Sequence, residues 1–262
     1  MKSNTKVSVI ISVLNGEGTL KKCIQSIVDQ KFTDWELIII DGGSRDSTVD
    51  IIKEFSLNIS FWISEKDTGI YNAWNKAIVK AKGEWLCFIG SDDILLPDSL
   101  QLLTELAVYP DINFVCSRVM MVDENGIEVG AIGKSWNFKN FDKGLGIVHC
   151  GALHHCSLFE NNNLFDESYK IAGDFEFLVR VGKRVKAAFL NEITVNMCNK
   201  GVSRSSVNKV ILETSRALYE SKDFQKVNGI NYFLSAHIRS IIRKIVFRLP
   251  FGNQLFALRN KN

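Results

Sequence analysis

Two adjacent carboxylates, Asp92 and Asp93, follow an apolar run and are the side chains of this sequence best suited to chemistry. A hard divalent cation such as Mg²⁺ or Mn²⁺ binds one or two carboxylates together with phosphate oxygens and water. Such a cation neutralises the negative charge that develops on a departing diphosphate. Since adjacent side chains point in different directions, one of the two carboxylates can reach a metal ion while the other holds a hydroxyl group of the ligand.

Two more acids stand where apolar runs end. Asp41 closes the run Trp35–Ile40, and Asp67 lies just beyond Ile59–Ile63. Each acid alone could simply cap a helix or a turn, which is a common role of Asp. If the runs are strands of one open sheet, however, the acids that follow them converge on one rim. Like charges crowded together are costly unless a cation or donor hydroxyl groups lie between them, so the set predicts a ligand site there.

The elements that carry these acids alternate between strands and helices. The predicted strands are Val7–Leu14, Trp35–Ile40, Ile59–Ile63 and Glu84–Ile89, and the clearest predicted helices are Glu17–Gln30 and Ile70–Ala81. Continuous apolar runs are typical of parallel strands that are covered on both faces. This α/β pattern predicts a Rossmann-like open sheet, flanked by helices, that binds ligands at the carboxyl ends of its strands.

The pattern changes after residue 110. Asn113–Val122 and Ile127–Ile132 predict a hairpin, because a turn-forming segment separates two apolar runs. The glycine-rich residues 133–150 predict a mobile loop near the site. We expect a helix near Asp174–Lys183, a short strand pair near 185–197 and helices from about Arg204.

The composition is that of an ordinary globular protein, with 46% hydrophobic residues, 23% charged residues and a net charge of +3. The six cysteines include no C-x-x-C pair, which predicts reduced thiols. The apolar run that begins at Val7 is too short for a transmembrane helix, and its segment has no cleavage-site pattern. We therefore expect a cytoplasmic protein.

The basic charge gathers in the tail from Phe224 to Asn262, which has seven basic residues and no Asp or Glu. Within it, residues 238–249 combine an apolar stripe at helical spacing (Ile238, Ile241, Ile242, Ile245, Val246, Leu249) with Arg239, Arg243, Lys244 and Arg248. A basic amphipathic helix suits an anionic membrane surface, although a helix packed on the main domain would show the same pattern. Because the rest of the chain is acidic and the tail has few interleaved aromatic residues, we expect no nucleic acid partner.

Four stretches, Val7–Glu17, Ile38–Thr48, Glu65–Ala77 and Phe88–Asp93, follow one another at a characteristic spacing. In that order they resemble the family 2 glycosyltransferases of the GT-A fold, over roughly residues 6–200. The variant Glu65-Lys66-Asp67-Thr68-Gly69-Ile70-Tyr71 looks especially like bacterial enzymes that build O-antigen or capsular polysaccharide.

The resemblance implies a role for each matching residue. Asn15 and Glu17 match the loop that contacts the nucleotide. Asp41 matches the acid that binds the base, commonly uracil, and Asp67 matches a further acid of the nucleotide pocket. Asp92 matches the acid near the ribose or sugar, and Asp93 matches the ligand of the metal ion, Mn²⁺ or Mg²⁺. Ser91 stands where the family's D-x-D motif often begins with an acid.

The resemblance also implies a catalytic base, an acid at the start of a helix in the second half. The matching stretch is Ala172-Gly173-Asp174-Phe175-Glu176. Inversion by single displacement needs one carboxylate to take the proton of the acceptor hydroxyl. Apolar neighbours would raise the proton affinity of Asp174 and suit it to this role. The alternative role of Asp174 is a helix N-cap, and Glu176 is then the fallback base.

Two histidines, His154 and His155, match a position where the family has a histidine on the acceptor and diphosphate side. Cys150 and Cys156 lie close by, which would suit zinc. Adjacent histidines, however, lack the i, i+3 or i+4 spacing that brings two ligands to one metal ion. We expect one of the pair to line the acceptor side and the other to pack.

The family implies an inverting, metal-dependent enzyme that moves a sugar from a nucleotide-sugar donor to a polyprenyl-diphosphate-linked glycan. Its catalytic domain would be 1–203, with a nucleotide-sugar-binding half 1–110 and an acceptor-binding half 111–203, followed by a helical extension 204–262. The last tryptophan is Trp136, so the Q-x-x-R-W motif of processive members cannot follow Asp174, and we expect a single transfer. A lipid-linked acceptor favours peripheral attachment to the inner face of the cytoplasmic membrane.

Two alternatives from other classes stay open. A nucleotidyltransferase would share the open sheet and the acidic metal site. It would also need a glycine-rich loop with a basic residue after the first strand, where Asn15-Gly16-Glu17-Gly18 has none. The second alternative is a non-catalytic protein that binds nucleotide sugars.

Overall fold

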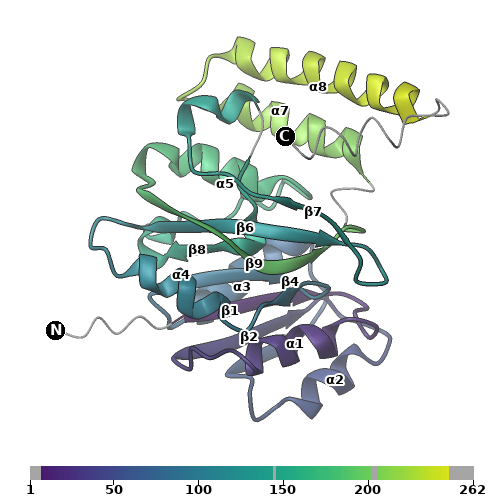
Figure 1. Ribbon diagram of the computed structural model, residues 1–262, viewed down its shortest axis with the longest axis vertical. Helices are drawn as coiled ribbons and strands as arrows, with labels where there is room; N and C mark the ends of the chain where they lie inside the picture. Colours follow the sequence, from purple (N-terminus) through teal and green to yellow (C-terminus); the bar gives the residue numbers. More distant parts are fainter. Residues whose placement is uncertain (1–6, 144–145, 202–205, 248–262) are drawn as a thin grey trace.

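The computed structural model describes residues 7–143, 146–201 and 206–247, with side chains described to Ser240 in the last helix. The strands form one mixed sheet in the order β3-β2-β1-β4-β8-β6-β9-β5, with β7 paired to β6 (Figure 1). They are β1 (Val7–Val13), β2 (Trp35–Asp41), β3 (Phe61–Ser64), β4 (Trp85–Gly90), β5 (Ile94–Leu95), β6 (Phe114–Val122), β7 (Glu128–Ile132), β8 (Ala152–His155) and β9 (Ala187–Cys198). The α-helices are α1 (Leu20–Val28), α2 (Thr48–Glu54), α3 (Ile70–Lys80), α4 (Ser99–Ala107), α5 (Gly173–Val181), α7 (Val207–Glu220) and α8 (Lys226–Phe247).

The first half of the chain builds the parallel part of the sheet. β1 pairs in parallel with β2 and with β4, and β2 pairs in parallel with β3. Side chains of β1 alternate between two cores, since Ile10 packs in the same core as Trp74 of α3, and Ile11 in the same core as Ile24 of α1. Strands that are apolar on both faces need a cover on each. The predicted open sheet with flanking helices is confirmed.

The second half adds strands of mixed direction. β8 lies between β4 and β6 and is antiparallel to both, whereas β9 runs parallel to β6. The predicted hairpin is confirmed as the antiparallel pair β6 and β7. The predicted strand pair near 185–197 is wrong, because β9 is one strand. Its exposed residues Asn191 and Glu192 form a bulge where the register with β6 shifts.

The segment 133–150 is packed over much of its described length rather than open. It contains two 3₁₀ helices, Phe138–Lys143 and His149–Gly151. The buried ring of Phe141 lies 4.7 Å from that of Trp136 and 5.8 Å from that of Phe175 on α5. These contacts tie the predicted loop to the core beneath α5.

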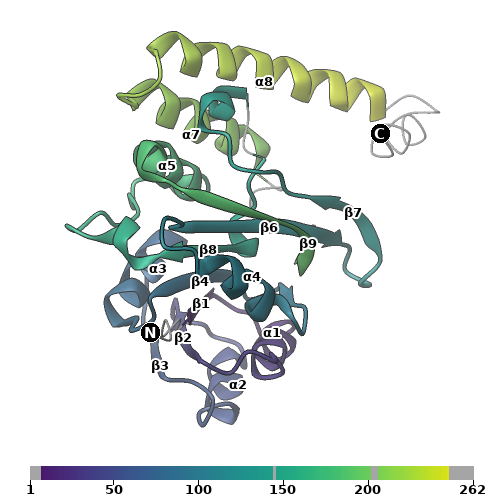
Figure 2. The same cartoon turned by 60° about the vertical axis from the view of Figure 1, so that its left-hand side comes forward.

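The two C-terminal helices lie at the end of the molecule remote from α1 and α2, with α7 against α5 and α8 on the outer side of α7 (Figures 1 and 2). An apolar hollow of about 310 Å³ between them is lined in part by Leu212, Tyr219 and Phe233. Among the described helices, none is both long and apolar enough to cross a membrane. The predicted boundary near residue 203 lies among residues outside the described part of the chain, so it stays a prediction.

Candidate active site

The loop after β1 is locked to the loop after β2. Asn15, in the left-handed region at φ 52°, accepts a hydrogen bond from the backbone of Arg45 through Oδ1 at 3.0 Å. Glu17 accepts one from the backbone of Ser47 through Oε2, also at 3.0 Å. Both predicted nucleotide-contacting side chains therefore shape the neighbouring loop at the carboxyl end of β2.

Asp41 is fully buried at the end of β2, and its oxygens bond inside the protein. It accepts hydrogen bonds from the backbone of Gly43 at 3.1 Å and of Ser44 at 3.0 Å. The hydroxyl groups of Ser44 and of Ser64 on β3 also donate to it. Three of these bonds go to Oδ2 and one goes to Oδ1, so both oxygens are bonded inside the protein and fix the turn that follows Asp41.

Asp67 lies directly against that turn. A Cβ atom placed on Gly42 would meet Asp67 Oδ2 at 2.7 Å, so a larger residue at 42 would displace this carboxylate. Asp67 Oδ1 also accepts a hydrogen bond from the backbone of Gly69 at 3.0 Å, just before α3. The structure thus brings Asp41 and Asp67 together, as the sequence predicts.

Asp92 and Asp93 follow β4 at the same rim. Ser91 Oγ would lie 3.6 Å from a Cβ on Gly16, which places the turn after β4 beside the loop after β1. Asp93 is 6% exposed and accepts hydrogen bonds from the backbone of Gly90 at 3.2 Å and of Cys198 on β9 at 3.0 Å. Burial, and then the charge of Asp92, raise the pKa of Asp93 to about 7. Asp92 is the more accessible acid.

Carboxylate oxygens at this turn are the ligand type that Mg²⁺ and Mn²⁺ prefer, and a metal ion bound there would offset the repulsion of two neighbouring acids. Asp92 and Asp93 therefore fit the predicted cation in their chemistry. Within the described residues, no group of three or more His, Cys, Asp or Glu side chains is arranged to hold a metal ion.

Asp174 lies in the first turn of α5, whose N-cap residue is Ala172. The N-cap alternative is therefore wrong for Asp174. Instead, Asp174 Oδ1 accepts a hydrogen bond from the hydroxyl of Tyr71 on α3 at 3.1 Å. The same hydroxyl donates to the carbonyl of Ile171 at 2.7 Å. Burial raises the pKa of Asp174, and the hydrogen bonds from Phe175 and Tyr71 lower it in part.

The stretch before α5 is bonded to the stretch that carries Asp67. Glu167 accepts hydrogen bonds from Asn72 Nδ2 at 2.9 Å and from Asn75 Nδ2 at 3.0 Å, both on α3. Lys170 Nζ donates to the carbonyl of Thr68 at 3.0 Å. The base candidate and the nucleotide-pocket acids are thus connected through the start of α3, although they come from distant parts of the sequence.

A family model described as Glycosyl transferase family 2 matches residues 8–162. The chain belongs to this family. A PGL/p-HBAD biosynthesis glycosyltransferase of Mycobacterium tuberculosis is 30% identical over 181 residues, which are 66% of this chain and 68% of the relative. The Escherichia coli protein named UDP-Glc:alpha-D-GlcNAc-diphosphoundecaprenol beta-1,3-glucosyltransferase WfgD is 30% identical over 122 residues, 46% of this chain and 48% of the relative.

The solved structure of S. aureus TarS in complex with UDP-GlcNAc has a TM-score of 0.68 to this chain at 17% identity. The match covers 95% of this chain and 77% of that one. It shows the fold, and the predicted GT-A architecture is confirmed. As a family 2 glycosyltransferase the protein acts on a nucleotide sugar, which sets the nucleotidyltransferase alternative aside.

The glycosyltransferase does not bring its two predicted histidines to the acidic rim. His155 pairs with Trp85 at the amino end of β4, whereas Asp92 and Asp93 follow the carboxyl end. His154 pairs with Leu86 and is fully buried, with its ring 4.9 Å from that of Phe114. The short strand β8 fixes both positions, because it runs antiparallel to β4 and therefore ends where β4 begins.

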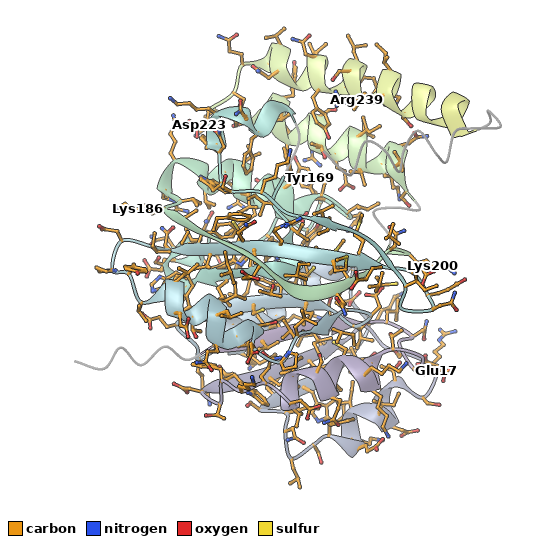
Figure 3. The ribbon with its side chains drawn as sticks, in the orientation of Figure 1. Glu17, Tyr169, Lys186, Lys200, Asp223 and Arg239 are labelled. Atoms are coloured by element: carbon orange, nitrogen blue, oxygen red, sulfur yellow. The ribbon has the colours of Figure 1, made fainter. Side chains whose placement is uncertain are left out.

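Three residues of the site are not among the predicted site residues. Tyr71 looks like an apolar position of an amphipathic helix, yet its hydroxyl contacts Asp174. Cys198 meets Asp93 only through the pairing of distant strands. Glu213 of α7 bonds the residues before α5. Figure 3 shows Glu17 and Lys200 toward one end of the strands and Lys186 at the other, in keeping with a rim at the carboxyl ends.

Proposed function

We propose that this glycosyltransferase moves a single sugar from a UDP-sugar to a polyprenyl-diphosphate-linked glycan, with inversion at the anomeric carbon and a divalent cation. The product would belong to a surface polysaccharide such as O-antigen or capsule. Support for the donor and the acceptor comes from the name of the E. coli relative, which includes UDP-Glc and a diphosphoundecaprenol-linked sugar. Support for UDP also comes from the similar fold of TarS, which was solved with UDP-GlcNAc.

The observation that carries the proposed chemistry is the hydrogen bond of 3.1 Å between Tyr71 and Asp174. In a single displacement the acceptor hydroxyl attacks the anomeric carbon while the UDP oxygen leaves, and a carboxylate takes the hydroxyl proton. A part-buried Asp with a raised pKa holds that proton better than an exposed one. In this proposal Tyr71 keeps the carboxylate turned toward the acceptor.

At the donor end, Asp41 and Asp67 form one wall of the proposed nucleotide pocket. Because the oxygens of Asp41 are already bonded, its part is to hold the turn around Gly43, whose backbone then faces the base. Asn15 and Glu17 support the same loop from β1. These four residues would therefore act on the nucleotide through the shape of the loops.

Asp93 is the proposed ligand of the cation, Mn²⁺ or Mg²⁺, and Asp92 the proposed partner of the ribose or sugar. When bound, such a cation neutralises charge on the departing diphosphate. The backbone bonds from Gly90 and Cys198 would hold the carboxylate of Asp93 in one orientation. The acceptor-side role of His154 and His155 is not kept, because neither residue lies near this rim.

The proposed place of action is the inner face of the cytoplasmic membrane, with α8 against an anionic lipid surface. Ala236 of α8 is buried, whereas Ile230, Leu234 and Ile238 are 50%, 54% and 57% exposed. At about 100° per residue these three lie on the side of the helix opposite Ala236. Of the predicted stripe over 238–249, the side chains of Ile238 and Arg239 are described, and the remaining members lie outside the described side chains.

The test is a transfer assay with Mn²⁺, a panel of UDP-, GDP- and dTDP-sugars and a synthetic polyprenyl-diphosphate-linked sugar. The proposal expects one added sugar, from a UDP donor, with the anomeric configuration inverted. Retention of configuration would contradict the role of Asp174 as base. Binding of nucleotide sugars without turnover on any acceptor would favour the non-catalytic alternative.

A further inference from the structure

Glu213 of α7 accepts hydrogen bonds from three successive backbone N–H groups. Its Oε2 lies 2.9 Å from the nitrogen of Ile171 and 2.8 Å from that of Ala172. Both of its oxygens lie within reach of the nitrogen of Lys170, at 3.0 and 3.1 Å. One carboxylate from the C-terminal helices thus bonds all three residues, 170–172, that lead into α5.

These bonds hold the segment that leads into α5, at a helix start whose N-cap residue offers no acceptor. The first N–H groups of a helix have no partner inside it, and a Ser, Thr, Asp or Asn at the N-cap usually supplies one. The N-cap of α5 is Ala172, which has no side-chain acceptor. Glu213 bonds the N–H of Ala172 and of the two residues before it, whereas the N–H of Phe175 inside the first turn bonds to Asp174.

The same approach is held from its other side by α3. Tyr71 donates to the carbonyl of Ile171 at 2.7 Å, so residue 171 is bonded at its N–H by Glu213 and at its carbonyl by Tyr71. The ring of Tyr71 also lies against Gly173, where a Cβ atom would meet a ring carbon at 2.7 Å. The backbone that carries Asp174 is therefore clamped between α3 and α7.

Two acids near this clamp are paired with arginines, whereas the described bonds of Glu213 are to backbone N–H groups. Arg180 is bonded to Glu176, and Arg216 to Glu220. Lys170 Nζ donates to backbone carbonyl groups of Thr68 and Glu167. The carboxylate of Glu167 accepts bonds from the neutral side chains of α3. No ion pair reaches Glu213 within the described residues.

We propose that Glu213 is a positioning residue for the catalytic base: by bonding the backbone of 170–172 it fixes the direction of Asp174 and adds its negative charge to the surroundings of that carboxylate. The inference rests on the proposed function of Asp174. It also gives the C-terminal helices a part in the reaction that is independent of any membrane contact.

The test is Glu213→Gln, which keeps the size of the side chain and one acceptor oxygen but loses the charge. We expect kcat to fall on the order of 10- to 100-fold, because small displacements of a reacting group are costly, while the KM for the UDP-sugar changes little. Burial raises the pKa of Asp174 and the charge of Glu213 adds to this. The low-pH limb of the kcat/KM profile should therefore move to lower pH in the variant.

Glu220→Gln is the matched control, since it removes a carboxylate from the same helix whose bonds go to the side chains of Tyr169 and Arg216. It should leave the pH profile in place. Glu213→Asp, which keeps the charge, should restore the profile even where kcat stays low. Melting curves with and without UDP and Mn²⁺ check that each variant is folded and binds the donor.

The proposal is overturned if Glu213→Gln, folded and binding UDP, keeps the kcat and the pH profile of the parent protein. It is also overturned if activity falls only in proportion to the folded fraction. Asp174→Asn in the same series tests the role of Asp174 separately from the role of Glu213. Full activity of Asp174→Asn would show that Asp174 is not the base, whatever the result for Glu213→Gln.

Discussion

The hydroxyl of Tyr71 on α3 lies 3.1 Å from Oδ1 of Asp174 on α5, across 103 residues of sequence. It also lies 2.7 Å from the carbonyl oxygen of Ile171. The hydroxyl proton of Tyr71 is thus shared between the carboxylate of Asp174 and the backbone carbonyl of Ile171. This contact joins the nucleotide half of the sheet to the half where the acceptor is expected.

Removing that hydroxyl with Tyr71→Phe should slow transfer about tenfold or more, because Asp174 loses the group that orients it. The bond from Tyr71 lowers the pKa of Asp174, so its loss should move the low-pH limb of kcat/KM to higher pH. This direction is opposite to that expected for Glu213→Gln. Unchanged pH profiles in both variants would show that neither side chain acts on Asp174.

Asp93→Asn should have different effects on folding stability and on metal-dependent donor binding. Burial and the charge of Asp92 raise the pKa of Asp93 to about 7, so the ionised form is unfavourable in the folded state. Because the pKa of Asp93 is lower in the unfolded chain, the contribution of Asp93 to the free energy of unfolding falls as pH rises from about 4 towards 7. With a chelator at pH 8, the variant should therefore melt at the same temperature as the parent protein or higher.

The same Asp93→Asn variant should lose the additional rise in melting temperature that Mn²⁺ gives in the presence of UDP. Asp98→Asn, which removes an exposed acid beyond the turn, is the control and should respond like the parent protein. An undiminished Mn²⁺ effect in Asp93→Asn would mean that the cation binds elsewhere.

Two buried histidines should make the protein sensitive to acid. Burial lowers the pKa of His154 to about 3 and that of His149 well below its usual value. Above pH 6.5 both folded and unfolded chains hold neutral rings, so there is no effect. Below pH 6.5 the unfolded chain binds protons at these rings, whereas the folded protein does not. His154 alone should therefore lower the free energy of unfolding by about 2 kcal/mol at pH 5.

His154→Phe removes this proton uptake and puts an apolar ring beside Phe88 and Phe114. Urea unfolding at pH 7 and pH 5 should show a smaller loss of unfolding free energy on acidification than in the parent protein. His237→Phe, on the outer helix α8, is the control. An equal loss in His154→Phe would show that other groups cause the acid sensitivity.

The exposed face of α8 should bind vesicles that contain an anionic lipid. We expect the triple change Ile230→Ser, Leu234→Ser and Ile238→Ser to weaken flotation with phosphatidylglycerol vesicles by about tenfold or more, because each side chain loses apolar area that the lipid would cover. High salt should weaken the parent protein's binding too. Leu57→Ser, at a residue that is 100% exposed, is the control.

The absence of flotation in the parent protein would contradict the membrane proposal. Dimerisation that depends on the same three residues would assign this face to a second copy of the chain. The apolar hollow between α7 and α8 borders this face, so light scattering alongside flotation distinguishes the two outcomes.

The parallel half of the sheet could be predicted because each strand there is a local signal. An apolar run such as Val7–Val13 is buried on both faces, and the acid that follows such a run lies at the rim. The convergence of Asp41, Asp67 and Asp93 on one rim follows from this pattern alone. Local apolar periodicity was enough because neighbouring units of the chain pair with one another.

The second half could not be predicted in the same way, because its pairings are long-range. β8 has four residues and is defined as a strand by β4 and β6 on its two sides. The polar pair Asn191 and Glu192 looks like a turn between two strands, whereas in the structure the two residues form a bulge within the single strand β9. The misplacement of His154 and His155 has the same origin, since their position depends on the direction of β8.

In the proposed reaction, Asp174 takes the proton of the acceptor hydroxyl during transfer from a UDP-sugar. The most direct measurement compares single-turnover transfer by the parent protein and by Asp174→Asn, with Mn²⁺, the UDP-sugar and a polyprenyl-diphosphate-linked acceptor. If Asp174 is the base, the variant should still bind UDP in a melting assay but transfer about 10²- to 10⁴-fold more slowly, the usual contribution of a general base. Transfer by Asp174→Asn at the rate of the parent protein would contradict this role of Asp174.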